Sequence, residues 1–188
     1  MRQNGVVDDS LKGKLLLASP ALQDPNFART VVLIAEHNED GAMGLVLNRP
    51  ATTTVAESAP ELEELVEAEE PIYIGGPVQP SAVIVLAAFE EPAAAGLLVR
   101  DDVGFLSAEA DFATSRDATR QLRVFAGHAG WGPGQLDEEL GREDWIVEPP
   151  LPQELFSEDA EELWGDVLTR KGGAFALVAR MPLDPSVN

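Results

Sequence analysis

The sequence lacks cysteine altogether, so it can form no disulfide bond, thiolate zinc site, iron–sulfur cluster or cysteine nucleophile. Basic residues are scarce as well. Thirteen lysines and arginines face 33 aspartates and glutamates, which gives a formal net charge of −20. Because affinity for nucleic acid depends on cations that neutralise phosphates, we expect no direct binding to nucleic acid.

Long hydrophobic runs are also missing. The longest covers only residues 82–89, whereas a membrane-spanning helix needs about twenty apolar residues. The N-terminal stretch has no sustained apolar segment of the kind that directs secretion. We therefore expect a cytoplasmic protein that does not associate with a membrane.

Histidine, the commonest metal ligand besides cysteine, occurs twice, as His37 and His128, with no HExxH motif. Residues 36–41 resemble the first half of a calcium loop, but the position that should supply a bidentate carboxylate is Leu47. We interpret this segment as a hairpin turn. The sequence therefore predicts no metal site and no cofactor.

Apolar segments rich in β-branched residues predict strands at residues 15–18, 30–36, 43–48, 71–74, 82–89 and 122–126. Asp40 and Gly41 tolerate positive φ and predict a hairpin between the second and third strands. A second hairpin is expected to turn at Asp101 and Asp102. Several strands are apolar on both faces, which indicates a sheet covered on both sides or bent around its own core.

Helical periodicity is clearest over residues 157–171, where Ser157 is the expected N-cap. The predicted apolar stripe of this helix consists of Ala160, Leu163, Trp164, Val167 and Leu168. A second helix is predicted at residues 58–69, because Ser58 and Glu61 have capping-box spacing. Shorter helices are expected at residues 133–141 and after Ser107.

Strands and helices interleave without strict alternation, and no internal repeat or linker divides the chain. This pattern predicts an α+β fold with a single domain, in which helices flank a bent mixed β-sheet. We place the domain at residues 11–181, between a frayed N-terminal segment at residues 1–10 and a C-terminal tail at residues 182–188.

Four segments at predicted strand ends set small or rigid residues beside polar ones: residues 24–29, 44–50, 75–78 and 130–135. Strand ends converge in a bent sheet, so we predict one shallow ligand-binding cleft there. Its expected lining is Asp24, Asn48, Arg49, Gly75, Gly76, Trp131 and Gln135. Arg49 would bind a carboxylate in bidentate fashion, with Asp24 as its partner when the cleft is empty.

The glycine-dense segment at residues 127–139 leaves two interpretations open. A dinucleotide-binding loop would need a glycine at Gln135, and no Lys-Ser or Lys-Thr pair follows for a triphosphate loop. These departures favour a close-packed turn in which Trp131 covers small backbone, over a ligand loop.

The chain also carries six sequence blocks in order over most of its length: LKGKLLLASPAL, DPNFARTVVLIAEH, GAMGLVLNRP, YIGGPV, GHAGWGPGQLDEEL and a C-terminal LF…LW. Together they resemble the AlgH family of bacterial cytosolic proteins, also called the YqgE family. The resemblance implies a single α+β domain with a bent mixed sheet, a proposed link to transcriptional control, and no agreed catalytic residues. Two positions depart from the family pattern: residues 86–89 lack a histidine often found there, and Asp137 stands where glutamate is usual.

No local nucleophile motif of the GxSxG or SxxK type occurs. This absence favours a non-enzymatic regulatory or binding protein, whose partner is an unidentified small molecule or protein. The alternative is a hydrolase-like or transferase-like enzyme that acts on a small molecule in the same cleft, with Asp24, His37, Asn48 and Arg49 as its working residues.

Overall fold

The computed structural model describes residues 10–182, so residues 1–9 and 183–188 of the two expected terminal segments lie outside the description. The strands are β1 (Leu15–Ala18), β2 (Val31–Asn38), β3 (Gly41–Val46), β4 (Pro50–Thr54), β5 (Pro71–Ile74), β6 (Val78–Phe89), β7 (Leu97–Arg100), β8 (Val103–Phe105), β9 (Thr119–Trp131) and β10 (Trp145–Glu148). The α-helices are α1 (Val55–Ser58), α2 (Phe112–Asp117), α3 (Gln135–Gly141), α4 (Leu163–Lys171) and α5 (Ala174–Val178). The 3₁₀-helices are η1 (Pro60–Leu65), η2 (Pro92–Ala94), η3 (Pro152–Glu154) and η4 (Ala160–Glu162).

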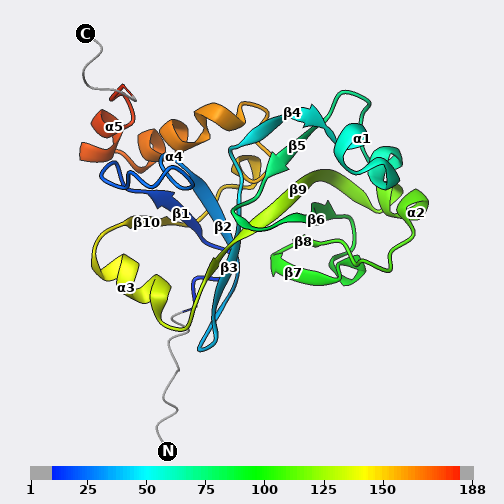
Figure 1. Ribbon diagram of the computed structural model, residues 1–188, viewed down its shortest axis with the longest axis horizontal. Coiled ribbons are helices and arrows are strands. Elements are labelled where there is room, and N and C mark those ends of the chain that lie inside the picture. The colour runs from blue at the N-terminus through cyan, green and yellow to red at the C-terminus, as the bar shows by residue number, and fades with distance from the viewer. Residues whose placement is uncertain (1–9, 183–188) are drawn as a thin grey trace, which may run out of the picture.

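The strands form one sheet in the order β10-β1-β2-β3-β9-β6-β8-β7, with β5 paired to β9 and β4 paired to β5 (Figure 1). The β5–β9 pair is parallel and the others are antiparallel, so the sheet is mixed. Both predicted hairpins are confirmed. β2 turns into β3 at Glu39 and Asp40, because Gly41 already pairs with Asn38, and β7 turns into β8 at Asp101 and Asp102. The predicted α+β fold is thereby confirmed.

The sheet bends where β9 passes Gly127, which has a φ of 72°. Val124 and Ala126 pack on the outer face before this point, and Ala129 does so beyond it. Even-numbered β9 residues therefore face outwards before Gly127 and odd-numbered ones after it, as happens at a β-bulge. A side chain at Gly127 would meet the carbonyl oxygen of Gly76 at 2.5 Å, so only glycine fits this bend.

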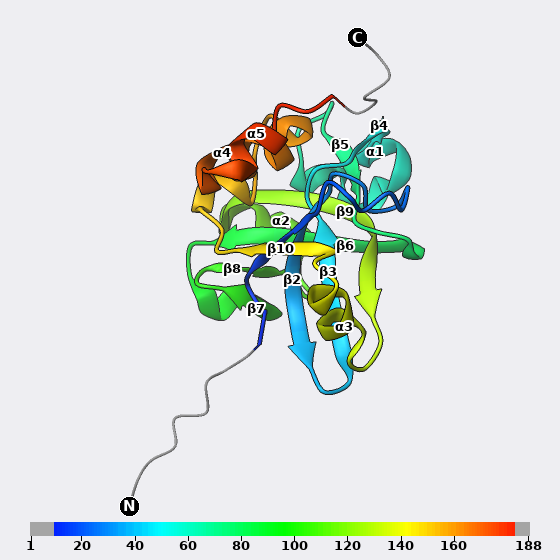
Figure 2. The same ribbon diagram turned by 90° about the vertical axis from the view of Figure 1, so that its left-hand side faces the viewer.

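Three apolar clusters result from this bend. The largest lies on the inner face of the sheet and is covered by η4 and α4. The predicted stripe is buried, with Ala160 on η4 and Leu163, Trp164, Val167 and Leu168 on α4. On the outer face, α3 covers a second cluster against β1 and β2, whereas α1, η1 and α2 cover a third against β6 and β9. Figure 2 shows α4 and α3 on opposite sides of β10 and β1.

Two helix predictions were wrong in detail. The helix predicted at residues 58–69 is α1 followed by η1, and its capping box consists of Thr54 and Glu57 rather than Ser58 and Glu61. Pro60 has no N–H to continue the α-helical hydrogen bonds, so the chain restarts there as a 3₁₀ turn. Ser157 does not cap α4, because η4 lies between the two. The N-terminus of η4 and the N-terminus of α4 both lack a side-chain cap.

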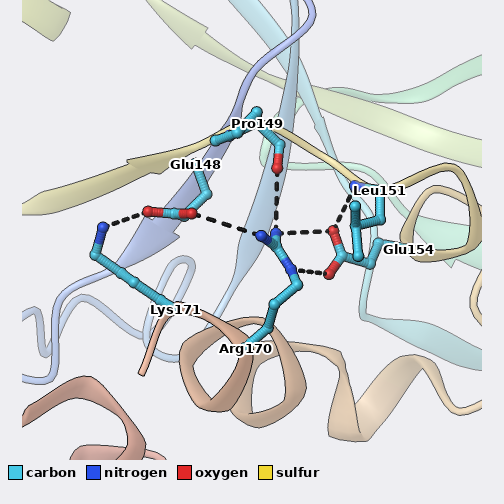
Figure 3. Close-up of polar contacts among 6 residues, drawn as sticks. All are labelled: Glu148, Pro149, Leu151, Glu154, Arg170 and Lys171. Carbon is cyan, nitrogen blue, oxygen red and sulfur yellow. Dashed lines mark hydrogen bonds and ion pairs between the residues drawn. The ribbon is translucent and has the colours of Figure 1, made fainter. Parts of the chain in front are cut away.

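A polar cluster joins the end of α4 to β10 (Figure 3). Arg170 donates from Nε and Nη2 to the two carboxylate oxygens of Glu154 at 2.7 and 3.1 Å, and its Nη2 also reaches the carbonyl of Pro149 at 3.1 Å. Glu148 lies 3.6 Å from Arg170 and pairs with Lys171. Glu148 and Glu154 are thus buried with cations beside them, and the network holds α4 over the inner face of the sheet.

Candidate functional site

The structure distributes the seven predicted cleft residues over three places. Asn48 and Arg49 line one cavity near α4, and Asp24 lies in the loop that Arg49 contacts. Gly75 and Gly76 lie at the bend of β9, and Trp131 and Gln135 lie beside α3. Among five well-formed cavities within residues 10–182, none is lined by more than two of the seven. That these seven residues bind a ligand stays a prediction.

Asn48 is a buried connector between β3 and the loop that precedes β2. Its Oδ1 accepts from the backbone N–H of Val31 at 2.9 Å, and its Nδ2 donates to the carbonyl of Arg29 at 2.9 Å. With both ends of its amide used, Asn48 fixes the loop against the sheet.

Arg49 holds the same loop from the other side. Its Nη1 donates to the carbonyls of Pro25 at 3.1 Å and Asn26 at 2.7 Å, and its Nη2 donates to Ala28 at 3.0 Å. These three hydrogen bonds use three of the five guanidinium donors.

Asp24 is not the ion-pair partner that the sequence suggested for Arg49. Its Oδ1 accepts from the backbone N–H of Asn26 at 2.8 Å, so it stabilises the loop. Burial lowers the pKa of Arg49, and the charge of Asp24 acts in the opposite direction without an ion pair being formed among the described residues.

A cavity of about 470 Å³ opens between this loop and α4. Its lining is Arg29, Asn48, Arg49, Glu161, Glu162, Trp164, Gly165 and Ala179. Two guanidinium groups and two carboxylates therefore share one cavity with an indole. Such a mixed lining can orient a small molecule that carries both charges.

Arg29 is the cavity residue that sequence reasoning missed. Its guanidinium lies 4.9 Å from the ring centroid of Trp164, and its Nη2 donates to the carbonyl of Met181 at 2.6 Å. Trp164 in turn donates from Nε1 to the carbonyl of Ala18 at 2.9 Å. The sequence offered a reason to choose Arg29, because cations are few and Arg29 is the last residue of the selected segment at residues 24–29.

Gly75 and Gly76 permit close contact between backbones. The N–H of Gly75 donates to the carbonyl of Ala126 at 2.9 Å. A Cβ on Gly75 would lie 2.3 Å from the carbonyl oxygen of Gly127, and one on Gly76 would lie 2.2 Å from the carbonyl carbon of His128. In this structure the space beside both glycines is filled by β9.

Trp131 and Gln135 meet at a carboxylate instead. Glu139 accepts from the indole N–H groups of Trp131 and Trp145 at 2.8 Å each, and from Nε2 of Gln135 at 2.9 Å. Phe27 stacks against Trp131 and meets Trp145 edge-on. The interpretation of residues 127–139 as a close-packed turn needs correcting, since β9 continues through Trp131 before the turn begins.

The titration of Glu139 reflects these contacts. Desolvation by burial would raise its pKa, but hydrogen bonds from Trp145, Gln135 and Trp131 and the charge of Arg142 outweigh that effect. The pKa of Glu139 is therefore lowered from its ordinary value.

The two histidines lie in different settings. His37, near the end of β2, accepts from the backbone N–H of Leu11 through Nδ1 at 3.1 Å, and its Nε2 is 3.8 Å from Asp137. The Nδ1 of His128 lies 3.2 Å from the carbonyl of Ala129. Residues 10–182 contain no group of three or more histidine and acidic side chains placed to hold a metal ion. No helix in that range is long and apolar enough to cross a membrane.

Comparison with known proteins places these features in a family. A model described as AlgH-like matches residues 15–176. UPF0301 proteins of Streptomyces coelicolor and Mycolicibacterium smegmatis are 41% and 39% identical to this chain, over 95% and 94% of it and 96% and 90% of their own lengths.

Two solved structures have the same fold. The crystal structure of a Corynebacterium diphtheriae protein matches with a TM-score of 0.82 and 30% identity, over 90% of this chain and 91% of that one. The solution structure of the AlgH protein from Pseudomonas aeruginosa matches with a TM-score of 0.71 and 32% identity, over 98% of this chain and 100% of that one. The sequence resemblance is thereby confirmed, and the chain belongs to the AlgH-like family.

Proposed function

We propose that this chain is a non-enzymatic binding protein whose ligand is a small aminocarboxylate, held in the cavity between α4 and the loop at residues 24–29. In this proposal the ligand carboxylate lies between Arg29 and Arg49, and its ammonium group faces Glu161 and Glu162. Any regulatory role of the kind that the family name suggests would follow from this binding rather than from contact with DNA.

The observation that carries the proposal is the state of the two arginines. The chain has a net charge of −20, yet neither Arg29 nor Arg49 has a carboxylate within 4 Å among the described residues. Both line the same cavity, and carbonyl oxygens and an indole hold them in place. Fixed cations without counter-ions at a cavity wall are suited to an anionic group.

In this proposal, two glutamates of the same cavity recognise the ammonium group of the ligand. Glu161 and Glu162 are exposed on η4 and line the same cavity, while Trp164 offers a buried apolar surface. A simple dianion would be repelled by these carboxylates, whereas a zwitterion satisfies both walls. A volume of about 470 Å³ lies within the range of small-ligand sites.

The arrangement does not favour the enzyme alternative. Asn48 contacts Val31 at the beginning of β2, whereas His37 lies six residues further along that strand. Six residues of a strand span about 20 Å, so His37 cannot act on a substrate that is held by Arg49 in this cavity.

Isothermal titration calorimetry with γ-aminobutyrate, butyrate and butylamine tests the proposal, because the last two each keep one charge only. We expect γ-aminobutyrate to bind more tightly than either. Replacing Arg29 with Gln should weaken γ-aminobutyrate binding at least about tenfold, since the loop is held by Arg49 and Asn48 and should stay in place.

The matched control is Arg142→Gln, which changes an exposed arginine paired with Asp144 near α3. This variant should bind as the unmodified protein does. The proposal fails if the unmodified protein binds none of the three compounds, or if Arg29→Gln binds γ-aminobutyrate as tightly as the control.

A further inference from the structure

Arg123 on β9 is a buried cation that the cavity near α4 does not use. Its side chain is 6% exposed, and its Nε is buried without any hydrogen-bond partner. No carboxylate lies within 4 Å of it among the described residues. An unpaired buried cation costs free energy, so folding alone gives no reason for an arginine at this position.

Two groups contact the Arg123 guanidinium. Its Nη2 donates to the carbonyl of Ser157 at 2.9 Å, and its central carbon lies 4.2 Å from the ring centroid of Tyr73. Burial lowers the pKa of Arg123, while Tyr73 and the more distant Glu70 act in the opposite direction. A neutral carbonyl and a ring face are weak substitutes for a carboxylate.

A cavity whose lining does not include Arg123 itself is lined by residues that lie one step from Arg123 on the sheet. Its volume is about 770 Å³, and Gln121 and Ala88 are part of its floor. Gln121 pairs with Ala88 across the sheet, and Arg123 pairs with Leu86, so all four lie on the inner face. Two residues along a strand span about 7 Å. Arg123 therefore lies about 7 Å along β9 from Gln121, which lines the cavity.

The segment that lines the cavity continues directly into the residue that accepts a hydrogen bond from Arg123. Leu155 and Phe156 line the cavity, and Ser157, which accepts the Nη2 hydrogen bond, follows directly. A small movement of the Ser157 carbonyl would open the inner end of the cavity to Nε and Nη2 of Arg123. These two donors lie on one edge of the guanidinium and match the two oxygens of a carboxylate.

We propose that Arg123 and this cavity form a second binding site, for a carboxylate with an apolar body. The body occupies the cavity against Ala88, Val103, Leu155 and Phe156, which are buried apolar residues of its lining. The carboxylate replaces the Ser157 carbonyl and accepts from Nε and Nη2 of Arg123. Arg100 and Arg120 also line the cavity, but they are paired with Asp101 and Asp102, whereas Arg123 has no carboxylate partner among the described residues.

The test uses phenylacetate as the probe and neutral phenylacetamide as its control. In nitrogen–proton NMR spectra, the Nε–H signal of Arg123 is the one that disappears in Arg123→Met. We expect phenylacetate to shift this signal and phenylacetamide to leave it unchanged. Arg123→Met should bind phenylacetate at least about tenfold more weakly.

The variant also separates a binding role from a structural one. Because the cation is unpaired, Arg123→Met should melt at the same temperature as the unmodified protein or higher, whereas a structural arginine would lower it by more than about 6 °C. Arg123→Lys keeps the charge but lacks the paired donors, and should bind phenylacetate weakly too. An unshifted Nε–H signal, equal binding by Arg123→Met, or a large loss of melting temperature in that variant would each overturn the proposal. Arg29→Gln should still bind phenylacetate, which distinguishes this site from the cavity near α4.

Discussion

At the scale of single residues, the indole of Trp164 links the inner core to the proposed ligand cavity. It is buried, donates a hydrogen bond to Ala18 and lies under Arg29. The sequence predicted its burial from helical periodicity, whereas its contact with Arg29 depends on two segments that lie far apart in the chain.

We expect Trp164→Ala to lower the free energy of unfolding by about 3 to 5 kcal/mol, because it leaves a cavity in the core and removes a buried hydrogen bond. Glu162 is exposed on the adjacent turn, and Glu162→Ala should change stability by less than about 0.5 kcal/mol. Urea denaturation followed by circular dichroism measures both. Equal midpoints for the two variants would contradict the assigned buried face.

Glu139 makes stability depend on pH. Its folded-state pKa is lowered, so it contributes stability above the pKa that it has in the unfolded chain, and that contribution is lost as pH falls through the folded-state pKa. Glu139→Gln should therefore lower stability at neutral pH by about 1 to 2 kcal/mol, the scale of hydrogen bonds to a partly exposed charge. The variant should also lose less stability than the unmodified protein on acidification.

Urea denaturation at a series of pH values between neutral and acid, followed by circular dichroism, measures this effect. Glu138→Gln, an exposed neighbour on α3, is the control and should behave as the unmodified protein does. An identical acid dependence in Glu139→Gln would show that the indole hydrogen bonds do not determine this titration.

At the scale of elements, hydrophobic patterning predicted the cores of six strands and both hairpins but not β4 or β10. The sequence of β4, PATTT, has one apolar side chain besides its proline and is held by pairing with β5. The extension of β9 to Trp131 was missed because its glycines resemble a loop, although they are what allows the strand to bend.

The helix cap was misplaced for a related reason. Thr54 and Glu57 have the same spacing as Ser58 and Glu61, and only the pairing of β4 with β5 decides which pair lies at the start of a helix. We expect Thr54→Ala to destabilise the protein by about 1 kcal/mol and Ser58→Ala to have little effect. Thermal unfolding of the two variants compares them directly, and the reverse order of melting temperatures would favour the sequence-based assignment.

At the scale of the whole molecule, the single α+β domain could be predicted, but the meeting of distant segments at a site could not. Of the seven chosen residues, Asn48 and Arg49 line one cavity together, because a polar pair after an apolar strand marks a strand end, and their role in binding a ligand stays a prediction. Arg29 and Arg123 were missed as candidates, since their lack of ion-pair partners becomes visible only in three dimensions.

The charge distribution of the whole molecule predicts that it does not bind duplex DNA. Arg116 and Arg120 pair with Glu67 and Asp102, and Arg123 is buried, so the one local cluster of arginines offers little to phosphates. Fluorescence anisotropy of a labelled duplex at physiological salt should show no binding at micromolar protein. A salt-sensitive complex of sub-micromolar affinity would refute this expectation.

Binding of a small aminocarboxylate beside Trp164 can be followed through the indole N–H signals of the three tryptophans in nitrogen–proton NMR spectra. Trp164 lines the proposed cavity, whereas Trp131 and Trp145 are bonded to Glu139 beside α3. On titration with γ-aminobutyrate, we expect the Trp164 signal to shift and saturate while the other two stay in place. A titration that moves the signals of Trp131 and Trp145 instead, or that moves none of the three, would contradict the proposed binding.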